Sequence, residues 1–163
     1  MVYTTAIFRL LAAVVVLTLV DCSCPDYWTS YASSCYTLIK NPSTWAGADD
    51  ICKDYDAFLV EVDTNAENEF LISFLKNKKL STRAVWLGGN DLLSESHWMW
   101  SHSQEPVIFT DWAPTQPDNV ANTENCLELA IESRFGFKWN DNVCSVRQYF
   151  ICEQPEPSNV IIG

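Results

Sequence analysis

Two segments early in the chain have the apolar spacing of amphipathic helices. The first follows Pro42-Ser43-Thr44, and its apolar residues recur at intervals of three and four: Trp45, Ala48, Ile51, Cys52 and Tyr55. The second begins at a capping box, in which Thr64 is expected to accept from one free backbone amide and Glu67 from another. Its predicted buried residues are Phe70, Leu71, Phe74 and Leu75. Both helices are expected to serve as scaffold.

Short segments with alternating, β-branched or aromatic residues surround these helices and predict strands. They are 35–39, 58–62, 85–87, 98–100, 126–131 and 149–153. Because both helices come early and most strands follow them, the pattern predicts an α+β domain whose sheets are short and mostly antiparallel.

The stretch from Gly88 to Asn125 differs from the rest of the chain. It is rich in Asn, Asp and Glu and has prolines at 106, 114 and 117, and only residues 98–100 are expected to be regular. A structureless stretch of this length in a compact domain is usually functional or is ordered by something it binds. A bound ion that ties the loops together is one such explanation.

An apolar run near the N-terminus predicts a signal peptide. Residues 10–20 are apolar apart from Thr18, and one basic residue, Arg9, precedes them. A helix of this length, at about 1.5 Å per residue, is too short for roughly 30 Å of hydrocarbon. We therefore expect residues 1–22 to be a signal peptide and not a membrane anchor. The expected protein is secreted and extracellular, with one domain over 23–154 and a short C-terminal tail over 155–163.

The chain has seven cysteines, which is an odd number for an oxidising compartment where thiols pair. Cleavage after Cys22 would leave six, whereas an earlier cleavage would leave Cys22 as a free or intermolecular thiol. Six cysteines allow 15 pairings, and arithmetic alone selects none of them. Their spacing is not typical of a zinc site.

The net charge of −11 argues against nucleic acid as a partner, because phosphate binding needs clustered Lys and Arg. The same charge is compatible with a hard cation. Ca²⁺ prefers about six to eight oxygen ligands from carboxylates, side-chain amides and backbone carbonyls. The triplets Gln116-Pro117-Asp118 and Trp139-Asn140-Asp141, together with Glu124, supply such oxygens. Taken alone, each triplet is more typical of a turn than of a site.

Taken together with other positions, these triplets make the chain resemble the C-type lectin domain family over nearly all of the predicted mature chain. The residues that carry the resemblance are Cys24-Pro25 with Trp28, Cys35-Tyr36, Trp45, Trp86-Leu87-Gly88-Gly89, Trp112, Glu124-Asn125-Cys126, Trp139-Asn140-Asp141, Cys144 and Tyr149-Phe150-Ile151-Cys152-Glu153. The resemblance implies the C-type lectin fold, with two α-helices packed on short, mostly antiparallel β-sheets and a long calcium-binding loop region. It also implies three disulfides: Cys24–Cys35, Cys52–Cys152 and Cys126–Cys144.

The resemblance further implies a sugar site built on calcium. The family's five ligands of the sugar-binding calcium fall on Gln116, Asp118, Glu124, Asn140 and Asp141, which all carry side-chain oxygens. In the family, two neighbouring sugar hydroxyls complete the coordination and bond to the same side chains. An auxiliary calcium site of many members falls on Asp91, Glu95, Asn119 and Asn125, with Glu124 shared. Two of these four residues are amides, which predicts weaker binding of a divalent ion.

The order of Gln116 and Asp118 resembles family members that bind galactose, whereas Glu first and Asn second would indicate mannose. Galactose-binding members usually carry an aromatic residue and a glycine-rich loop directly after the triplet. Here that stretch is Asn119-Val120-Ala121-Asn122-Thr123, without a ring or a glycine. We therefore expect a galactose-type preference that is broader or weaker than in those members.

The expected partners are galactose-type glycans on microbial or cell-surface glycoconjugates, in innate-immune recognition or agglutination. No enzyme is expected, because the sequence has no recognisable nucleophile arrangement, HExxH motif or phosphate-binding glycine loop. The alternative is a calcium-binding lectin-like protein that binds a mineral surface, ice or another protein. Binding that galactose cannot compete would indicate that alternative. The oligomeric state stays open.

Overall fold

The computed structural model describes residues 23–131 and 135–157. The predicted signal peptide over 1–22, including Cys22, and residues 158–163 of the predicted tail lie outside the described residues. No helix in the described part of the chain combines the length and the apolar character needed to cross a membrane.

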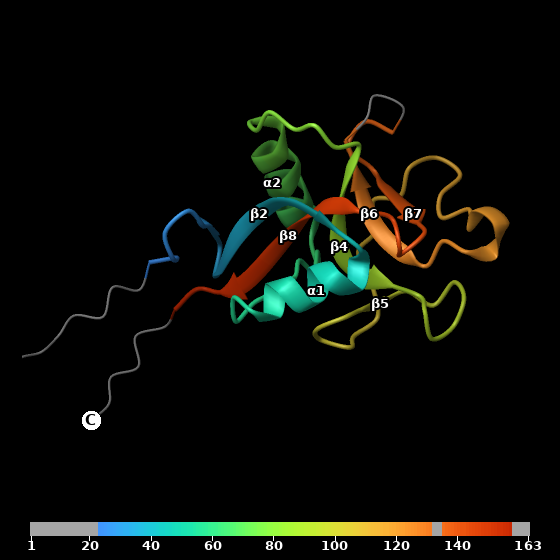
Figure 1. Cartoon of the computed structure of the whole chain (residues 1–163), viewed down its shortest axis with the longest axis horizontal. Coiled ribbons are helices and arrows are strands. Elements are labelled where there is room, and N and C mark those ends of the chain that lie inside the picture. The colour runs from blue at the N-terminus through green and yellow to red at the C-terminus, as the bar shows by residue number, and fades with distance from the viewer. Residues whose placement is uncertain (1–22, 132–134, 158–163) are drawn as a thin grey trace, which may run out of the picture.

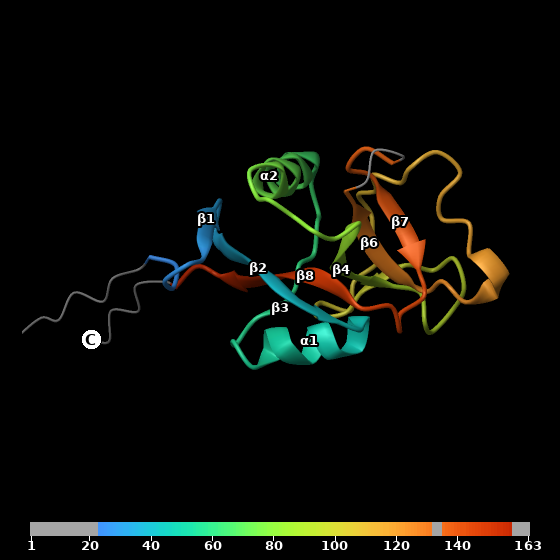
Figure 2. The ribbon, with the colours of Figure 1, turned by 45° about the horizontal axis from the view of Figure 1, so that its top comes forward.

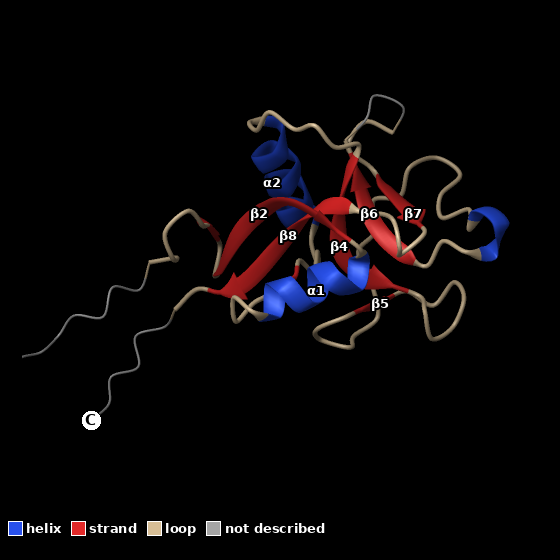
Figure 3. Cartoon of the chain, in the orientation of Figure 1, coloured by secondary structure: helices blue, strands red, loops and turns tan. Residues whose placement is uncertain are grey.

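A mixed β-sheet organises the described residues (Figures 1 and 3). Its strands are β1 (Thr29–Tyr31), β2 (Ser34–Ser43), β3 (Phe58–Leu59), β4 (Ala84–Asn90), β5 (Met99–Trp100), β6 (Cys126–Ala130), β7 (Trp139–Asn142) and β8 (Gln148–Pro155). The strand order is β1-β2-β8-β4-β6-β7, with β3 paired to β8 and β5 paired to β4. The pair β4–β8 is parallel, and the other pairs of these strands are antiparallel. The predicted α+β class with mostly antiparallel pairing is confirmed.

Two α-helices, α1 (Trp45–Lys53) and α2 (Asn65–Lys76), lie on opposite sides of β2 and β8 (Figure 2). Both begin where the sequence predicts. Thr44 caps α1 by accepting from the Gly47 amide at 3.2 Å. The placement of Tyr55 on the buried face of α1 was wrong, because the helix ends before it and its side chain is 53% exposed. Tyr55 packs edge-on against Trp28 instead, with ring centroids 6.4 Å apart.

The predicted capping box of α2 is confirmed in its first half only. Thr64 Oγ1 accepts from the Glu67 amide at 3.2 Å. The Glu67 carboxylate returns to the amide of Asp63, one residue before the expected position, at 3.2 Å. The reason lies in tertiary structure: the other oxygen of Glu67 accepts from the Tyr36 hydroxyl of β2 at 2.6 Å, and this contact draws the side chain away from Thr64.

Large aromatic and aliphatic side chains fill the space between the sheet and the helices. The largest fully buried side chains include Trp86, Trp100, Trp139, Tyr36 and Phe150. From α2, Leu71 and Leu75 enter this core, as predicted. Phe70 and Phe74 are only partly buried at its edge, so the predicted apolar face of α2 is buried along one half.

The polar loop region begins later than predicted, because Gly88, Gly89 and Asn90 belong to β4. A Cβ atom on Gly88 would lie 2.6 Å from the carbonyl oxygen of Leu59, and one on Gly89 would lie 2.6 Å from Leu127 Cδ2. The two glycines therefore permit close approach of neighbouring segments and do not mark a loop. Beyond β4, the region is mostly loop, with β5 and the short 3₁₀ helix η1 (Val120–Asn122) as regular elements.

Three disulfides close the described part of the chain, and they are the pairs that the family resemblance implies: Cys24–Cys35, Cys52–Cys152 and Cys126–Cys144. The bond between Cys52 and Cys152 joins α1 to β8 across a sequence separation of 100 residues. The bond between Cys126 and Cys144 joins the start of β6 to the segment after β7. It therefore ties together the two strands that border the polar loops.

Candidate metal centre

Three carboxylates converge beside the end of β7. Asp118, Glu124 and Asp141 each offer an oxygen, and these three oxygens lie within 4.8 Å of one another. Two ligands on opposite sides of a calcium ion, each at about 2.4 Å, are about 4.8 Å apart. The spacing therefore fits oxygens that share one ion of this size. Among residues 23–131 and 135–157, no other group of three or more Asp, Glu, His or Cys side chains has the spacing of metal ligands.

Strand β7 carries Asp141 and is anchored in the core by Trp139. The Trp139 ring is fully buried, and its indole nitrogen donates to Asn68 Oδ1 of α2 at 3.0 Å. Antiparallel pairing with β6 places Asp141 opposite Leu127. The rigid core thus fixes the position of one carboxylate, while the other two come from the neighbouring loop.

The loop before β6, drawn in orange in Figure 1, donates backbone hydrogen bonds to the Asp141 side chain. One Asp141 oxygen accepts from the Asp118 amide at 3.2 Å, and the other accepts from the Asn119 amide at 2.7 Å. The Glu124 carboxylate accepts from the Val120 amide at 2.9 Å, and the Glu124 amide donates to Asn119 Oδ1 at 3.0 Å. Backbone amides of the loop therefore hold two of the three carboxylates in place.

Burial and repulsion between neighbouring charges raise the pKa of two of these carboxyl groups. Burial raises the pKa of Asp141 above its ordinary value, and the nearby Asp118 adds to the rise although backbone amides oppose it. Burial likewise raises the pKa of Glu124, and the charges of Asp141 and Asp118 contribute. A divalent cation would favour the ionised form of each group. The charge of the donor set therefore fits a hard cation.

The two predicted amide ligands lie next to these carboxylates. Gln116 precedes Pro117 across a cis peptide bond, and Gln116 Oε1 accepts from the Asp118 amide at 3.1 Å. Asn140 lies beside Asp141 in β7 and is 9% exposed. The assignment of all five residues as ligands stays a prediction.

The predicted auxiliary residues lie on the adjoining loops. The Asp91 amide donates to the Asn125 carbonyl at 3.2 Å, and Asn119 Nδ2 donates to Glu95 Oε2 at 2.5 Å. Asp91 is 3% exposed, and its Oδ1 has no hydrogen-bond partner among the described residues. Burial raises the pKa of Asp91, and the Glu95 and Asp141 charges add to the rise. A buried carboxylate oxygen without a donor is a group that a cation would satisfy.

A second acidic group, which the sequence reasoning missed, lies between α2 and the β2–β8 pair. Glu153 is 7% exposed and contacts the Tyr36 hydroxyl at 3.3 Å, while Tyr36 also donates to Glu67. Glu153 Oε2 accepts from the Glu61 amide at 3.3 Å. Burial raises the pKa of Glu153 to about 7, and the nearby Glu67 charge adds to the rise. No local motif indicates this group, because its members come from four separate segments.

This group predicts a pH dependence of stability that Glu153→Gln should reduce. The ordinary pKa of a glutamate is 4.5, and the pKa of Glu153 in the folded protein is about 7. The folded state therefore binds the proton more tightly than the unfolded chain does. The resulting stability is fully present below pH 4.5 and is lost as the pH rises through about 7. The loss is on the order of 3 kcal/mol. Urea unfolding in EDTA at pH 5 and at pH 8 should show this fall in the parent protein. If Glu153→Gln gave an equal fall, the prediction would be wrong.

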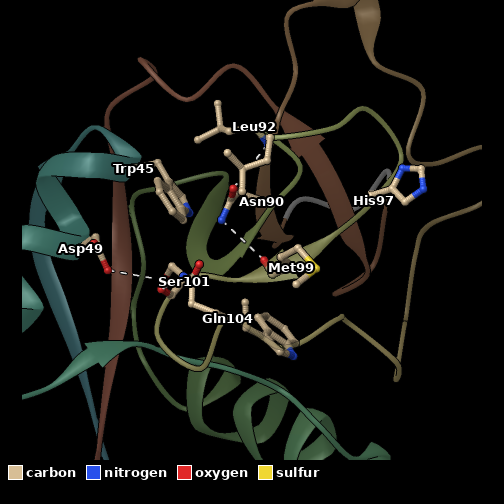
Figure 4. Close-up of a pocket in the computed structure, with 10 residues that line it drawn as sticks. Trp45, Asp49, Asn90, Leu92, His97, Met99, Ser101 and Gln104 are labelled. Carbon is tan, nitrogen blue, oxygen red and sulfur yellow. Dashed lines mark hydrogen bonds between the residues drawn. The ribbon is translucent and has the colours of Figure 1, made fainter.

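A hollow of about 300 Å³ lies between α1 and β5 (Figure 4), and its lining does not include the carboxylate cluster. Its lining includes Trp45, Asp49, Asn90, Leu92, His97, Met99, Ser101 and Gln104. Polar groups in this lining bond to one another or to neighbouring residues. Asp49 pairs with Lys53 at 2.6 Å, and Gln104 Nε2 donates to the Ser101 carbonyl at 2.5 Å. This arrangement presents no convergent set of ligand groups, so the candidate site is the carboxylate cluster.

With two helices packed on this mixed sheet and the cysteines paired across it, the fold is that of a C-type lectin domain, a class of non-enzymatic carbohydrate-binding modules. The family model described as Lectin C-type domain matches residues 41–154, so the chain belongs to this family.

Known proteins agree with this assignment. The galactose-specific lectin nattectin of Thalassophryne nattereri is 30% identical over 130 residues, which cover 80% of this chain and 79% of that protein. The alpha-N-acetylgalactosamine-specific lectin of Patiria pectinifera is 32% identical over 144 residues, or 82% of this chain and 84% of that one. The crystal structure of human lithostathine matches with a TM-score of 0.76 and 30% identity, over 89% of this chain and 99% of that chain.

Proposed function

We propose that this lectin binds glycans through a calcium ion held by Gln116, Asp118, Glu124, Asn140 and Asp141. The observation that carries the proposal is the convergence of three carboxylate oxygens within 4.8 Å, on loops anchored to a rigid strand. The exposed side chain of Asp118 and the partly exposed Glu124 would make the ion accessible from solvent.

The chain's own groups would recognise the sugar by the pattern of donors and acceptors around the ion. When bound, calcium supplies positive charge to which sugar hydroxyl oxygens can coordinate. The carboxylates of Asp118 and Glu124 can only accept hydrogen bonds from those hydroxyls. Gln116 can also donate through Nε2, because its Oε1 is the atom that accepts from the Asp118 amide. An amide and a carboxylate in this order would favour a galactose-type arrangement of hydroxyls.

The loop after the triplet supports a broad preference. Val120 is the apolar side chain there and is 58% exposed, and residues 121–123 are small or polar and exposed. A branched aliphatic side chain offers less flat surface to the apolar face of a sugar than an aromatic ring does. The two lectins compared above are described as galactose-specific and as alpha-N-acetylgalactosamine-specific, and both descriptions agree with a galactose-type ligand.

We extend the domain to residues 23–154, beyond the matched 41–154. Strand β1 pairs with β2, and the Cys24–Cys35 disulfide ties the preceding segment to the sheet. With residues 1–22 as a signal peptide, the protein would be secreted, and recognition or agglutination of microbes through surface glycans would be its role. Its oxidised cysteines agree with an extracellular location.

Retention on immobilised galactose tests the proposal directly. The protein should bind the resin in calcium, and EDTA or free galactose should release it, while free mannose should release it less efficiently. Measurement of the eluted fraction by absorbance is sufficient. Release by EDTA but not by either sugar would favour binding to a mineral surface, ice or a protein, and retention that persists in EDTA would exclude the calcium mechanism.

A paired substitution supplies the matched control for sugar choice. Gln116→Glu with Asp118→Asn keeps the number of carboxylates and amides but exchanges their positions, so calcium affinity should change little. The preference should shift from galactose toward mannose by roughly tenfold, since a net hydrogen bond is worth about 1 kcal/mol and about 1.4 kcal/mol corresponds to tenfold in affinity. An unchanged preference would show that the order of the two groups does not select the sugar.

A further inference from the structure

Glu128, in the middle of β6, is a buried carboxylate that gathers three side-chain amides. It is 5% exposed. Its Oε1 accepts from Asn140 Nδ2 at 2.9 Å, and its Oε2 accepts from Asn142 Nδ2 at 2.8 Å and from Gln148 Nε2 at 2.5 Å. The antiparallel register of β6 and β7 places Glu128 directly opposite Asn140. The contact with Asn140 therefore follows from the pairing of the two strands.

This contact determines which way the Asn140 amide points. A carboxylate can only accept, so the amide nitrogen of Asn140 must face Glu128. The second hydrogen of that nitrogen points to the carbonyl oxygen of Asp141, at 2.5 Å. Reversing the amide would set Oδ1 against a carboxylate oxygen and would leave two acceptors in contact. Both hydrogens of Asn140 are thus engaged, and Oδ1 is the atom left for another interaction.

The surroundings of Glu128 extend to the carboxylate cluster. A hollow of about 310 Å³ is lined by Glu124, Glu128, Asn140, Asn142 and Gln148, among others. One buried carboxylate therefore adjoins two of the residues that are proposed to hold the ion.

We infer that Glu128 is a positioning residue that fixes the Asn140 side chain so that its carbonyl oxygen, and not its amide nitrogen, is offered to the cation. This inference rests on the proposed function.

A double-mutant cycle read by calcium titration tests the inference. Glu128→Gln should lower calcium affinity about tenfold, which is the usual scale for partners that orient a metal ligand. In an Asn140→Ala background, the same substitution should change affinity by less than about twofold, because the group it positions is gone. Glu69→Gln, at an exposed site on α2, removes one negative charge as a matched control and should leave the affinity within about twofold.

The side-chain amide signals of Asn140 in calcium-free protein give a readout that does not need the ion. In the parent protein, the two hydrogens should exchange slowly with solvent and have well-separated NMR shifts. In Glu128→Gln, exchange should be faster and the signals should move. Equal loss of calcium affinity in both backgrounds would mean that Glu128 acts only through its charge, and unchanged amide signals would also overturn the inference. A parent protein without calcium affinity would contradict the proposed function, while the amide signals would still decide the role of Glu128.

Discussion

Replacing Asp141 by asparagine is expected to lower calcium affinity by more than about 100-fold, since even partners that only orient a ligand are worth roughly 10–100-fold. Asp141 is fully buried, and its two oxygens accept from the amides of Asp118 and Asn119. Asparagine keeps the size but removes the charge, and its nitrogen cannot accept from either amide. The substitution therefore replaces a charged ligand with a neutral one and weakens the hold on the loop that carries another ligand. Calcium titration by calorimetry, or terbium luminescence, measures the loss.

Asp54→Asn is the matched control for Asp141→Asn. Asp54 is exposed at the end of α1 and is not among the clustered carboxylates, so the same change of charge there should leave calcium affinity within about twofold. Thermal unfolding in EDTA separates loss of ligation from loss of fold, because the parent and both variants should retain a cooperative transition. Calcium affinity that is equal in Asp141→Asn and Asp54→Asn would show that the cluster does not hold the ion.

Removing the Cys52–Cys152 disulfide, by alanine at both positions, is expected to cost about 5 kcal/mol of unfolding free energy on the chain-entropy model. The bond closes a separation of 100 residues and both cysteines are fully buried. For a domain of this size the loss corresponds to a fall in Tm of roughly 15–20 °C. Without this bond, α1 and β8 depend on packing alone. Scanning calorimetry of the parent and the double variant measures the difference.

The Cys24–Cys35 disulfide offers an internal comparison. It closes a separation of only 11 residues, so serine at both positions should cost about 3 kcal/mol on the same model. The variant should therefore unfold between the parent protein and the Cys52–Cys152 variant. If the short-loop variant were the less stable of the two, loop closure would not explain how these bonds stabilise the domain.

Local patterns in the sequence predicted the helices well, because each helix is specified by nearby residues. Thr64 caps α2 as predicted and α1 begins directly after Pro42-Ser43-Thr44 as predicted, and spacing of three and four residues identified Ala48, Leu71 and Leu75 as buried. The error at Tyr55 lies where that spacing continues past the helix end. Tyr55 is exposed because the chain turns after Lys53, and the spacing of apolar residues does not predict where a turn begins.

Strand boundaries were predicted less well, because pairing partners decide them. Gly88 and Gly89 were assigned to the loop region, although both are strand residues of β4, where Gly88 approaches the backbone of Leu59 and Val60 and Gly89 approaches Leu127. The triplet Trp139-Asn140-Asp141 was interpreted as a turn or a ligand set, and it also forms most of β7. Its polar residues are acceptable in a strand because Asn140 bonds to Glu128 and Asp141 to loop amides.

By itself, the sequence determined the class of fold, the two helices, the cysteine positions, and the oxygen-bearing residues around the two triplets. Those features depend on residue type and on short-range spacing. Only the tertiary structure decided which side-chain atoms meet: the three carboxylates within 4.8 Å, the Glu128 contact with Asn140, and the buried group around Glu153. The physical reason is that strand register and loop closure bring together residues from distant segments, and a carboxylate's partner is set by that geometry and not by its neighbours along the chain.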